Sequence, residues 1–119
     1  MIKFIQIFLI GLVAFEHIYF MILEMFLWTK PKGLKTFGLK KEFAEQSKVL
    51  AANQGLYNGF LAAGLIWAIL DKEHTTMLSV FFLSCVVIAG AYGAYSTKRI
   101  KLFYMQSVPA IIALIVVFL

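Results

Sequence analysis

Residues 4–28 read FIQIFLIGLVAFEHIYFMILEMFLW, an apolar stretch long enough to cross about 30 Å of hydrocarbon as a helix. Three ionisable side chains interrupt it, namely Glu16, His17 and Glu24. A charged side chain at bilayer depth costs about 2.5 to 3.5 kcal/mol on insertion scales, so such groups are rare there and usually mark a functional site. These three residues are therefore the first candidates for acid–base or ligand-binding chemistry.

The rest of the chain extends this pattern. With 119 residues, 62% of them hydrophobic, and a mean hydropathy of +0.89, the composition excludes a soluble domain with an ordinary charged surface. Further apolar runs cover about 49–70, 77–95 and 102–119. We expect the second helix to begin before it enters lipid, because the charges at Lys41, Glu45 and Lys48 are spaced to pair on one helical face.

The sequence thus predicts an all-α fold: an integral membrane up-down-up-down bundle of four transmembrane helices. The whole chain, 1–119, is predicted to form a single transmembrane domain. Its helices are expected at about 4–28, 40–70, 77–95 and 102–119.

Glycine and proline residues predict where these helices end and pack. The first helix should end at Trp28, because Pro31 and Gly33 break helical continuation. Pro109 should kink the last helix or open its first turns. The second helix carries a ridge of small residues, Gly55, Gly59 and Ala63, which permits close approach of another helix. Its polar residues, Asn53, Gln54, Tyr57 and Asn58, are centred nearly opposite that ridge by angular position.

Basic residues predict the orientation of the chain in the membrane. Six lysines fall within 30–48 and three basic residues within 98–101, whereas in 71–76 Lys72 is balanced by Asp71 and Glu73. Since Lys and Arg in short loops stay on the cytoplasmic side, we expect a multi-pass protein of the cell membrane with both termini extracytoplasmic. The net charge of +5 is interpreted as an orientation signal and a contact for membrane lipids. Nucleic acid is not an expected partner, because no nucleic-acid motif is present.

A polar cavity is predicted in the cytoplasmic half of the bundle. At about 100° per residue, His17 and Glu24 share one stripe of the first helix, with Glu16 beside it. Because chain direction alternates, Glu24 should lie level with the start of the second helix. The residues predicted to line this cavity and bind a ligand are Glu16, His17, Glu24, Asn53, Gln54, Tyr57, Asn58, Tyr92 and Gln106.

Two readings of this polar set remain open. Asn and Gln side chains can join helices as a purely structural hydrogen-bond network. Alternatively, the carboxyls and His17 exchange protons or bind a ligand. No metal site and no cofactor are predicted, since His17 and Glu24 lie two helical turns apart and His74 lies in the opposite loop.

Three blocks of the sequence resemble the domain-of-unknown-function 1304 family of small bacterial four-helix membrane proteins. They are EHIYFMILEMFLW at 16–28, TKPKGLKTFGL at 29–39 and NQGLYNGFLAAGLIW at 53–67. The resemblance implies a four-helix membrane fold and supplies no reaction. The family's motif positions in this chain are Glu16, His17, Glu24, Asn53, Gln54, Tyr57 and Asn58.

Three functions follow as hypotheses. The first is a protein, dimeric if it alternates access, that binds or transports a small cationic or lipophilic compound while Glu16 or Glu24 exchanges a proton. The second is a membrane-embedded, isomerase-like enzyme in which the carboxyls and His17 act as general acid and base on a lipophilic substrate. The third is a structural or regulatory membrane subunit whose polar groups only join helices.

Overall fold

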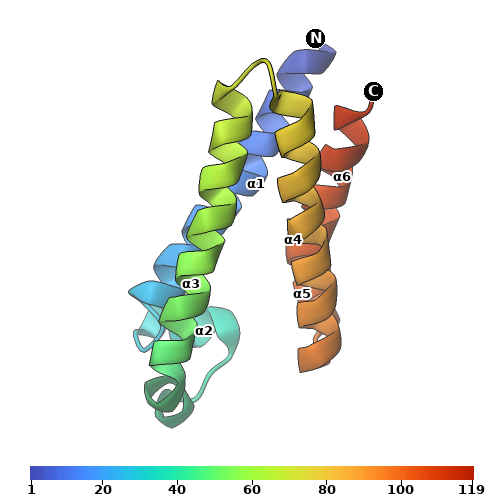
Figure 1. Ribbon diagram of the computed structural model, residues 1–119. Helices are drawn as coiled ribbons and strands as arrows, with labels where there is room; N and C mark the ends of the chain where they lie inside the picture. The colour runs from blue at the N-terminus through green and yellow to red at the C-terminus, as the bar shows by residue number, and fades with distance from the viewer. The chain divides into compact units, whose positions relative to one another are not determined.

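The computed structural model describes residues 1–119, and all of its regular elements are helices (Figure 1). In chain order they are α1 (Ile2–Met25), α2 (Pro31–Phe37), α3 (Lys41–Leu70), α4 (Thr75–Thr97), α5 (Ile100–Leu102), the π-helix η1 (Phe103–Ser107) and α6 (Val108–Val117). The all-α prediction is confirmed. The chain divides into two compact units, Phe15–Ala62 on the one hand and Met1–Ala14 with Ala63–Leu119 on the other. The prediction of one transmembrane domain concerns how these units pack together and stays a prediction.

Three helical segments are long and apolar enough to cross a membrane: α1, α4 and the continuous stretch Ile100–Val117. Only 17% to 33% of the residues in these segments are buried within the protein, so most of their apolar side chains face outward. Such surfaces are stable in lipid and unfavourable in water, which indicates a membrane protein. The predicted second crossing lies in α3, where the amides of Asn53, Gln54 and Asn58 lower the hydropathy of the first half.

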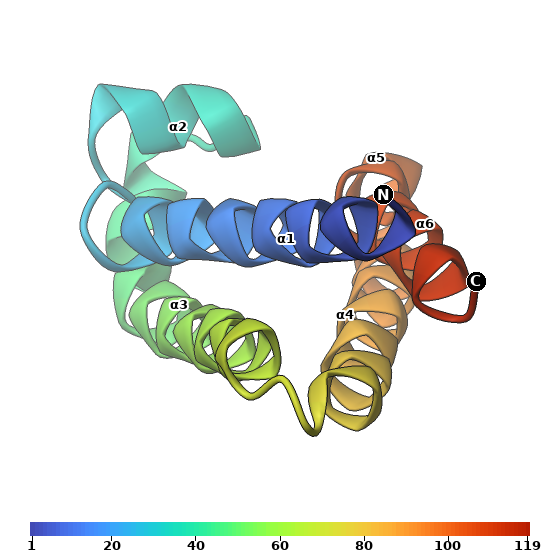
Figure 2. The same ribbon diagram turned by 90° about the horizontal axis from the view of Figure 1, so that it is seen from above.

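In the Phe15–Ala62 unit, α1 ends three residues earlier than expected and a short helix follows that the sequence analysis did not predict. Pro31 occupies the first turn of α2, where its missing N–H costs nothing. Gly33, interpreted above as a helix breaker, lies buried inside α2, where an added Cβ would fall 1.9 Å from the Leu27 carbonyl oxygen. Figures 1 and 2 accordingly show α2 beside the end of α1. Pro31 therefore begins α2 instead of ending a helix. Gly33 lets α2 lie directly against the backbone at Leu27.

Within the same unit, the first half of α3 runs antiparallel to the second half of α1. Two of the three small residues predicted to form a ridge make the contact: an added Cβ at Gly55 would lie 2.7 Å from Cγ of Met25, and one at Gly59 would lie 2.7 Å from Sδ of Met21. Ala63, the third, is exposed and belongs to the other unit. Nearer the start of α3, the indole N–H of Trp28 donates to Oγ of Ser47 at 3.0 Å. Close packing of these helices therefore depends on the absence of side chains at positions 55 and 59.

In the other unit, α4 packs antiparallel against η1 and α6 (Figure 1). The closest approach is at Gly90, where an added Cβ would lie 2.1 Å from Oγ of Ser107. That hydroxyl donates to the Val87 carbonyl at 2.9 Å. The last helix widens into η1 directly before Pro109, since proline clashes with the carbonyl four residues back and an extra residue per turn relieves the clash. The predicted disturbance at Pro109 takes the form of this π-helical turn.

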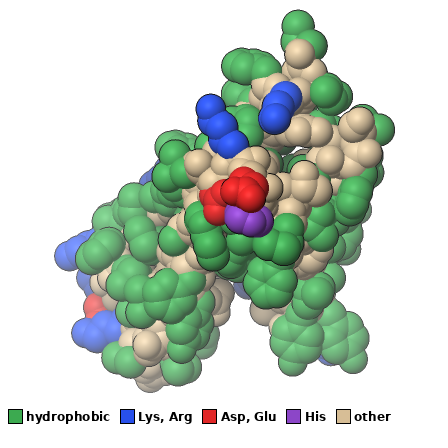
Figure 3. Space-filling model, turned by 45° about the horizontal axis from the view of Figure 1, so that its top comes forward, with side chains coloured by type: hydrophobic (Ala, Val, Ile, Leu, Met, Phe, Trp, Pro, Cys, Tyr) green, Lys and Arg blue, Asp and Glu red, His purple; other side chains and the backbone are tan.

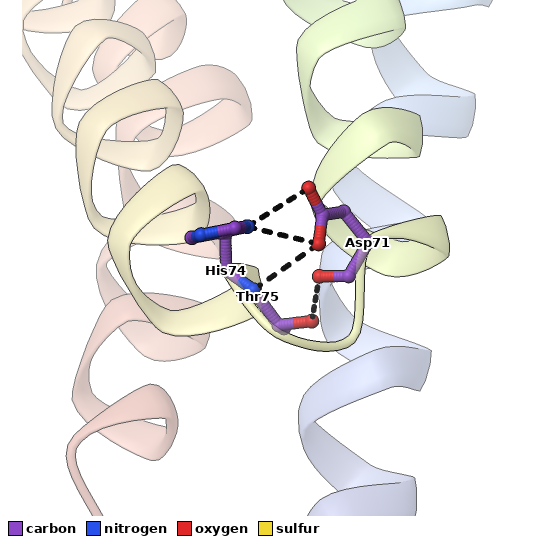
Figure 4. A network of polar contacts seen from close by, with 3 residues as sticks. All are labelled: Asp71, His74 and Thr75. Carbon is purple, nitrogen blue, oxygen red and sulfur yellow. Dashed lines mark hydrogen bonds and ion pairs between the residues drawn. The ribbon is translucent and has the colours of Figure 1, made fainter.

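The turn between α3 and α4 is held by its own polar groups (Figure 4). Nδ1 of His74 lies 3.1 Å from each carboxylate oxygen of Asp71, and Oγ1 of Thr75 donates to the Asp71 carbonyl at 3.0 Å. The hydrogen bond from the His74 side chain holds the pKa of Asp71 below its ordinary value. The electrostatic attraction between the two side chains acts in the same direction. Figure 3 shows acidic and histidine side chains gathered in one place, with Lys or Arg side chains beside them and many hydrophobic side chains around them.

Candidate functional site

The candidate site is built around Glu24, a carboxylate in the last turn of α1 that is only 5% exposed. Nε2 of Gln54 donates to its Oε2 at 3.0 Å, and Nδ2 of Asn58 donates to its Oε1. Each carboxylate oxygen therefore has its own amide donor. We call these three residues the Glu24 cluster.

Helical spacing explains why both amides reach one carboxylate. Gln54 and Asn58 are four residues apart on α3, so their side chains lie one turn apart on the same face. Gly55 lies between them on the helix surface, and an added Cβ there would come within 3.0 Å of Cβ of Glu24. The small residue brings the backbones of α1 and α3 close enough for short amide side chains to span the gap.

This geometry corrects one expectation from the sequence. The polar residues of α3 do not act together on a face opposite the glycine ridge. Gln54 and Asn58 adjoin the ridge and share its partner, α1. Asn53 and Tyr57 are exposed: the Asn53 amide donates to the carbonyl of Val49 in its own helix, and the Tyr57 ring packs against Phe60. At about 100° per residue, the four residues fall into two pairs four residues apart. Gln54 and Asn58 face α1, whereas Asn53 and Tyr57 face outward.

The negative charge of an ionised Glu24 has no positively charged partner within its unit. No Lys, Arg or His side chain of the Phe15–Ala62 unit forms an ion pair with Glu24. Two neutral amides can satisfy the lone pairs of a carboxylate, but they do not cancel its charge. A buried charge without a counter-ion is costly, so the group favours a proton or a cation as its partner.

Glu16 and His17 form a second polar pair on α1. Nδ1 of His17 lies 4.0 Å from Oε1 of Glu16, and the histidine side chain is fully buried, with its ring edge-on to Phe20. Oε1 of Glu16 is buried and accepts no hydrogen bond, although the residue as a whole is partly exposed. The burial of His17 and Glu24 agrees with the predicted inward stripe of α1.

Tyr92 and Gln106 belong to the other unit, and the prediction that they line one cavity with Glu24 stays a prediction. Tyr92 is 68% exposed on α4, while Gln106 is half-buried in η1. No three His, Cys, Asp or Glu side chains are arranged to hold a metal ion.

Sequence reasoning missed two features that shape the surroundings of Glu24. Met21 and Met25 pack on the glycine ridge, and Trp28 ties the end of α1 to Ser47 on α3. The spacing of Met21 and Met25, four residues or one helical turn apart, does predict that they share one face of α1. Which helix they face is a tertiary property that their spacing does not encode.

The comparisons with known proteins match this chain over most of its length. Residues 11–118 match the family described as "Protein of unknown function (DUF1304)". The chain is also 35% identical over 106 residues to the uncharacterized protein YpaA of Lactococcus lactis subsp. lactis (strain IL1403), covering 87% of this chain and 88% of that one. No solved structure matches significantly. With a match that includes the second half of α1, all of α3 and the Glu24 cluster, the chain belongs to the DUF1304 family of proteins of unknown function.

Proposed function

We propose that this membrane protein binds a small cationic or lipophilic compound, and transports it, with proton exchange at Glu24. One observation carries the proposal: Glu24 is buried, both its oxygens accept amide hydrogen bonds, and no cation of its unit neutralises it. Structural cohesion alone is served at lower cost by a third amide than by a carboxyl group. A titratable group held by neutral donors can instead exchange a proton for a cationic ligand.

The neighbours of Glu24 support this reading. Met21 and Met25 are flexible and polarisable, so they can repack around apolar parts of different compounds. Gln54 is exposed as a residue although its amide reaches the carboxylate, so one donor can rotate away when a ligand enters. A ligand would thus replace Gln54 at Oε2 while Asn58 continues to hold Oε1.

For the arrangement in the membrane, we propose that α3 is a fourth crossing and that both termini lie outside the cytoplasm. The 30 residues of α3 extend about 45 Å as an α-helix, more than the hydrocarbon thickness. The lysines of 30–48 and the basic residues of 98–101 would then lie together in the cytoplasm. Transport across the bilayer by alternating access would further require a homodimer, because four helices enclose little volume.

The Glu16–His17 pair supports a second candidate, an acid–base enzyme acting on a lipophilic substrate. A buried carboxylate oxygen without a hydrogen bond lies 4.0 Å from a buried imidazole nitrogen, and this pair can pass a proton between them once a substrate or water bridges the gap. Under this candidate, His17→Gln abolishes turnover of a lipophilic substrate while leaving cation binding at Glu24 intact.

The deciding experiment measures proton release on ligand binding. The purified full-length protein in detergent is titrated calorimetrically with tetraphenylphosphonium, a lipophilic cation, in buffers of different ionisation enthalpy. We expect binding coupled to release of close to one proton, and loss of that release in Glu24→Gln. The matched control is Glu42→Gln, an exposed carboxyl at the start of α3. Equal proton release in Glu24→Gln and wild type would refute the role of Glu24, and no binding of any cation in a broad panel would refute cation binding.

A further inference from the structure

Exposed side chains on one side of α3 follow a regular spacing. They recur in alternating steps of three and four residues, at Phe43, Gln46, Leu50, Asn53, Tyr57 and Phe60. This is the spacing by which two helices wind around each other in a coiled coil. All six lie in the Phe15–Ala62 unit, and we call them the α3 seam. The buried residues Ala44, Ala51 and Asn58 lie on a different side of α3, so packing within the unit leaves the α3 seam uncovered.

The first part of the α3 seam is apolar although charged residues surround it. Phe43 is 54% exposed between Glu42 and Glu45, and the charges of α3 continue as far as Lys48. These charges keep the first turns of α3 in water, where an exposed aromatic ring is unfavourable. Lipid does not relieve this cost, because it does not cover a charged segment. This end of the α3 seam therefore favours a protein partner.

The next part of the α3 seam is polar where the crossing by α3 proposed above puts it in lipid. The Asn53 amide donates to the carbonyl of Val49, but its side-chain oxygen accepts no hydrogen bond within the chain. Tyr57 is 60% exposed, and its ring contacts Phe60 while its hydroxyl has no partner. Polar groups of a membrane helix face another helix in preference to acyl chains. Both parts of the α3 seam thus carry the chemistry that their own solvent disfavours, which indicates that protein covers them.

The residues of the α3 seam suit a second copy of the same chain. Copies inserted in one membrane with one orientation have parallel α3 helices, so a two-fold contact places each residue of the seam opposite itself. Leu50 then packs on Leu50. The amide of Asn53 has both donors and an acceptor, so it can pair with its own copy and fix the register. No charged residue belongs to the α3 seam, so no like charges meet.

We propose that the α3 seam joins two copies of this chain in a parallel, symmetric dimer. The proposal rests on the crossing by α3 and identifies the contact of the homodimer that alternating access requires. Gln54 directly follows Asn53, and its amide donates to Glu24. The second copy therefore lies beside the Glu24 cluster, next to the donor that a ligand would displace.

Cysteine crosslinking of the full-length protein in isolated membranes tests the dimer. In a Cys85→Ala background, single cysteines are introduced on the α3 seam as Gln46→Cys or Asn53→Cys. The matched control is Glu45→Cys, which is equally exposed and adjacent to position 46 but lies on another side of the helix. With copper phenanthroline we expect a species of twice the chain mass. The seam positions should give about tenfold more of it than the control, because a disulfide needs Cβ atoms within about 4.5 Å.

A charge on the α3 seam supplies the second measurement. Leu50→Glu places two carboxylates opposite each other and should abolish the crosslink at position 46. Because Leu50 is 75% exposed, the fold of one chain should persist, with an unchanged melting temperature of the monomer in detergent. A crosslink that survives Leu50→Glu, equal crosslinking at 45 and 46, or none at either seam position would overturn the proposal. A crosslinked species that contains a different protein would overturn the assignment to a second copy.

The crossing by α3 is tested separately in the same membranes. Phe60→Cys should resist a membrane-impermeant maleimide after the membranes are opened, because lipid and the second copy surround it. Rapid labelling at 60 together with the crosslink at 46 would support the dimer and refute the crossing. Neither measurement depends on a bound cation, so failure of cation exchange at Glu24 is distinguishable from failure of the dimer.

Discussion

At the scale of single residues, one buried carboxylate and its two amide donors join α1 to α3. Glu24 needs Gln54 and Asn58 because a buried carboxylate oxygen without a donor has lost its water and gained nothing. Asn53 lies next to Gln54 in the sequence, but its amide binds its own helix. Residue type alone therefore does not tell an amide that bonds another helix from one that bonds its own.

A double-mutant cycle tests this assignment. Asn58→Leu should lower the free energy of unfolding by about 1 to 3 kcal/mol, because it leaves Oε1 of Glu24 buried without a donor. In a Glu24→Leu background the same substitution should cost much less, since no acceptor remains. Equilibrium unfolding in mixed micelles measures both. Asn53→Leu is the control and should stay within about 0.5 kcal/mol of wild type; additive effects at 24 and 58 would contradict the contact.

The turn residue Asp71 gives a pH-dependent prediction. Its pKa is lowered mainly by the hydrogen bond from His74, so the folded turn favours the ionised carboxylate. This contribution is complete above the ordinary carboxyl pKa and is lost as the pH falls through the lowered pKa of the folded state. Carbon-13 NMR titration of the Asp71 carboxyl should show the low value in wild type.

In His74→Ala, the pKa of Asp71 should rise towards its ordinary value. Thr76 is an exposed neighbour whose side chain makes no hydrogen bond with Asp71, so Thr76→Ala should leave the pKa of Asp71 as low as in wild type. An identical titration curve for wild type and His74→Ala would exclude the histidine as the cause.

At the scale of helices, glycines decide which elements touch. Gly33, Gly55 and Gly90 each lie where an added Cβ would meet another segment of the chain at 2.7 Å or less: the turn at Leu27, α1 and η1, respectively. Gly93, one turn from Gly90 on the same helix, would place its Cβ an ordinary 3.8 Å from Leu102. The contacts of α4 with η1 therefore depend on one of these two glycines and tolerate change at the other.

Alanine at these two positions makes a matched pair of variants. Gly90→Ala should lower the free energy of unfolding by about 1 to 3 kcal/mol, because its Cβ overlaps Oγ and the backbone N of Ser107. Gly93→Ala should be neutral or slightly stabilising, since alanine is the better helix former. Thermal unfolding in detergent compares them. Equal melting temperatures for the two variants would show that α4 and η1 do not approach as closely as described.

At the scale of the whole molecule, surface chemistry and charge determine how the chain meets its environment. The membrane helices expose most of their apolar residues, and the basic residues cluster in two short stretches. Lipid suits the first kind of surface, and in the orientation proposed above the second kind lies on the cytoplasmic side. These properties belong to the chain as a whole and do not depend on any one contact.

Cysteine labelling tests the proposed orientation. With Cys85 replaced by alanine, a single cysteine is introduced at Lys35 or at Glu73, both exposed. In intact cells a membrane-impermeant maleimide should label the cysteine at 73 and should reach the one at 35 only after the membrane is opened. The reverse pattern would show the opposite orientation in the membrane. Labelling of both cysteines in intact cells would place positions 35 and 73 on the same side and rule out a crossing by α3.

The sequence by itself determined the helical class, the membrane character and the buried face of α1, because helical periodicity and hydropathy are local properties of neighbouring residues. It also marked Glu24, Gln54 and Asn58, since polar groups within apolar runs stand out without any coordinates. Only the tertiary structure decided that Gln54 and Asn58 share one carboxylate while Asn53 and Tyr57 face outward, and that Pro31 begins a helix packed on Leu27. The reason is that these choices depend on which backbones approach within a few ångström, and that approach is set by packing between segments distant in the chain.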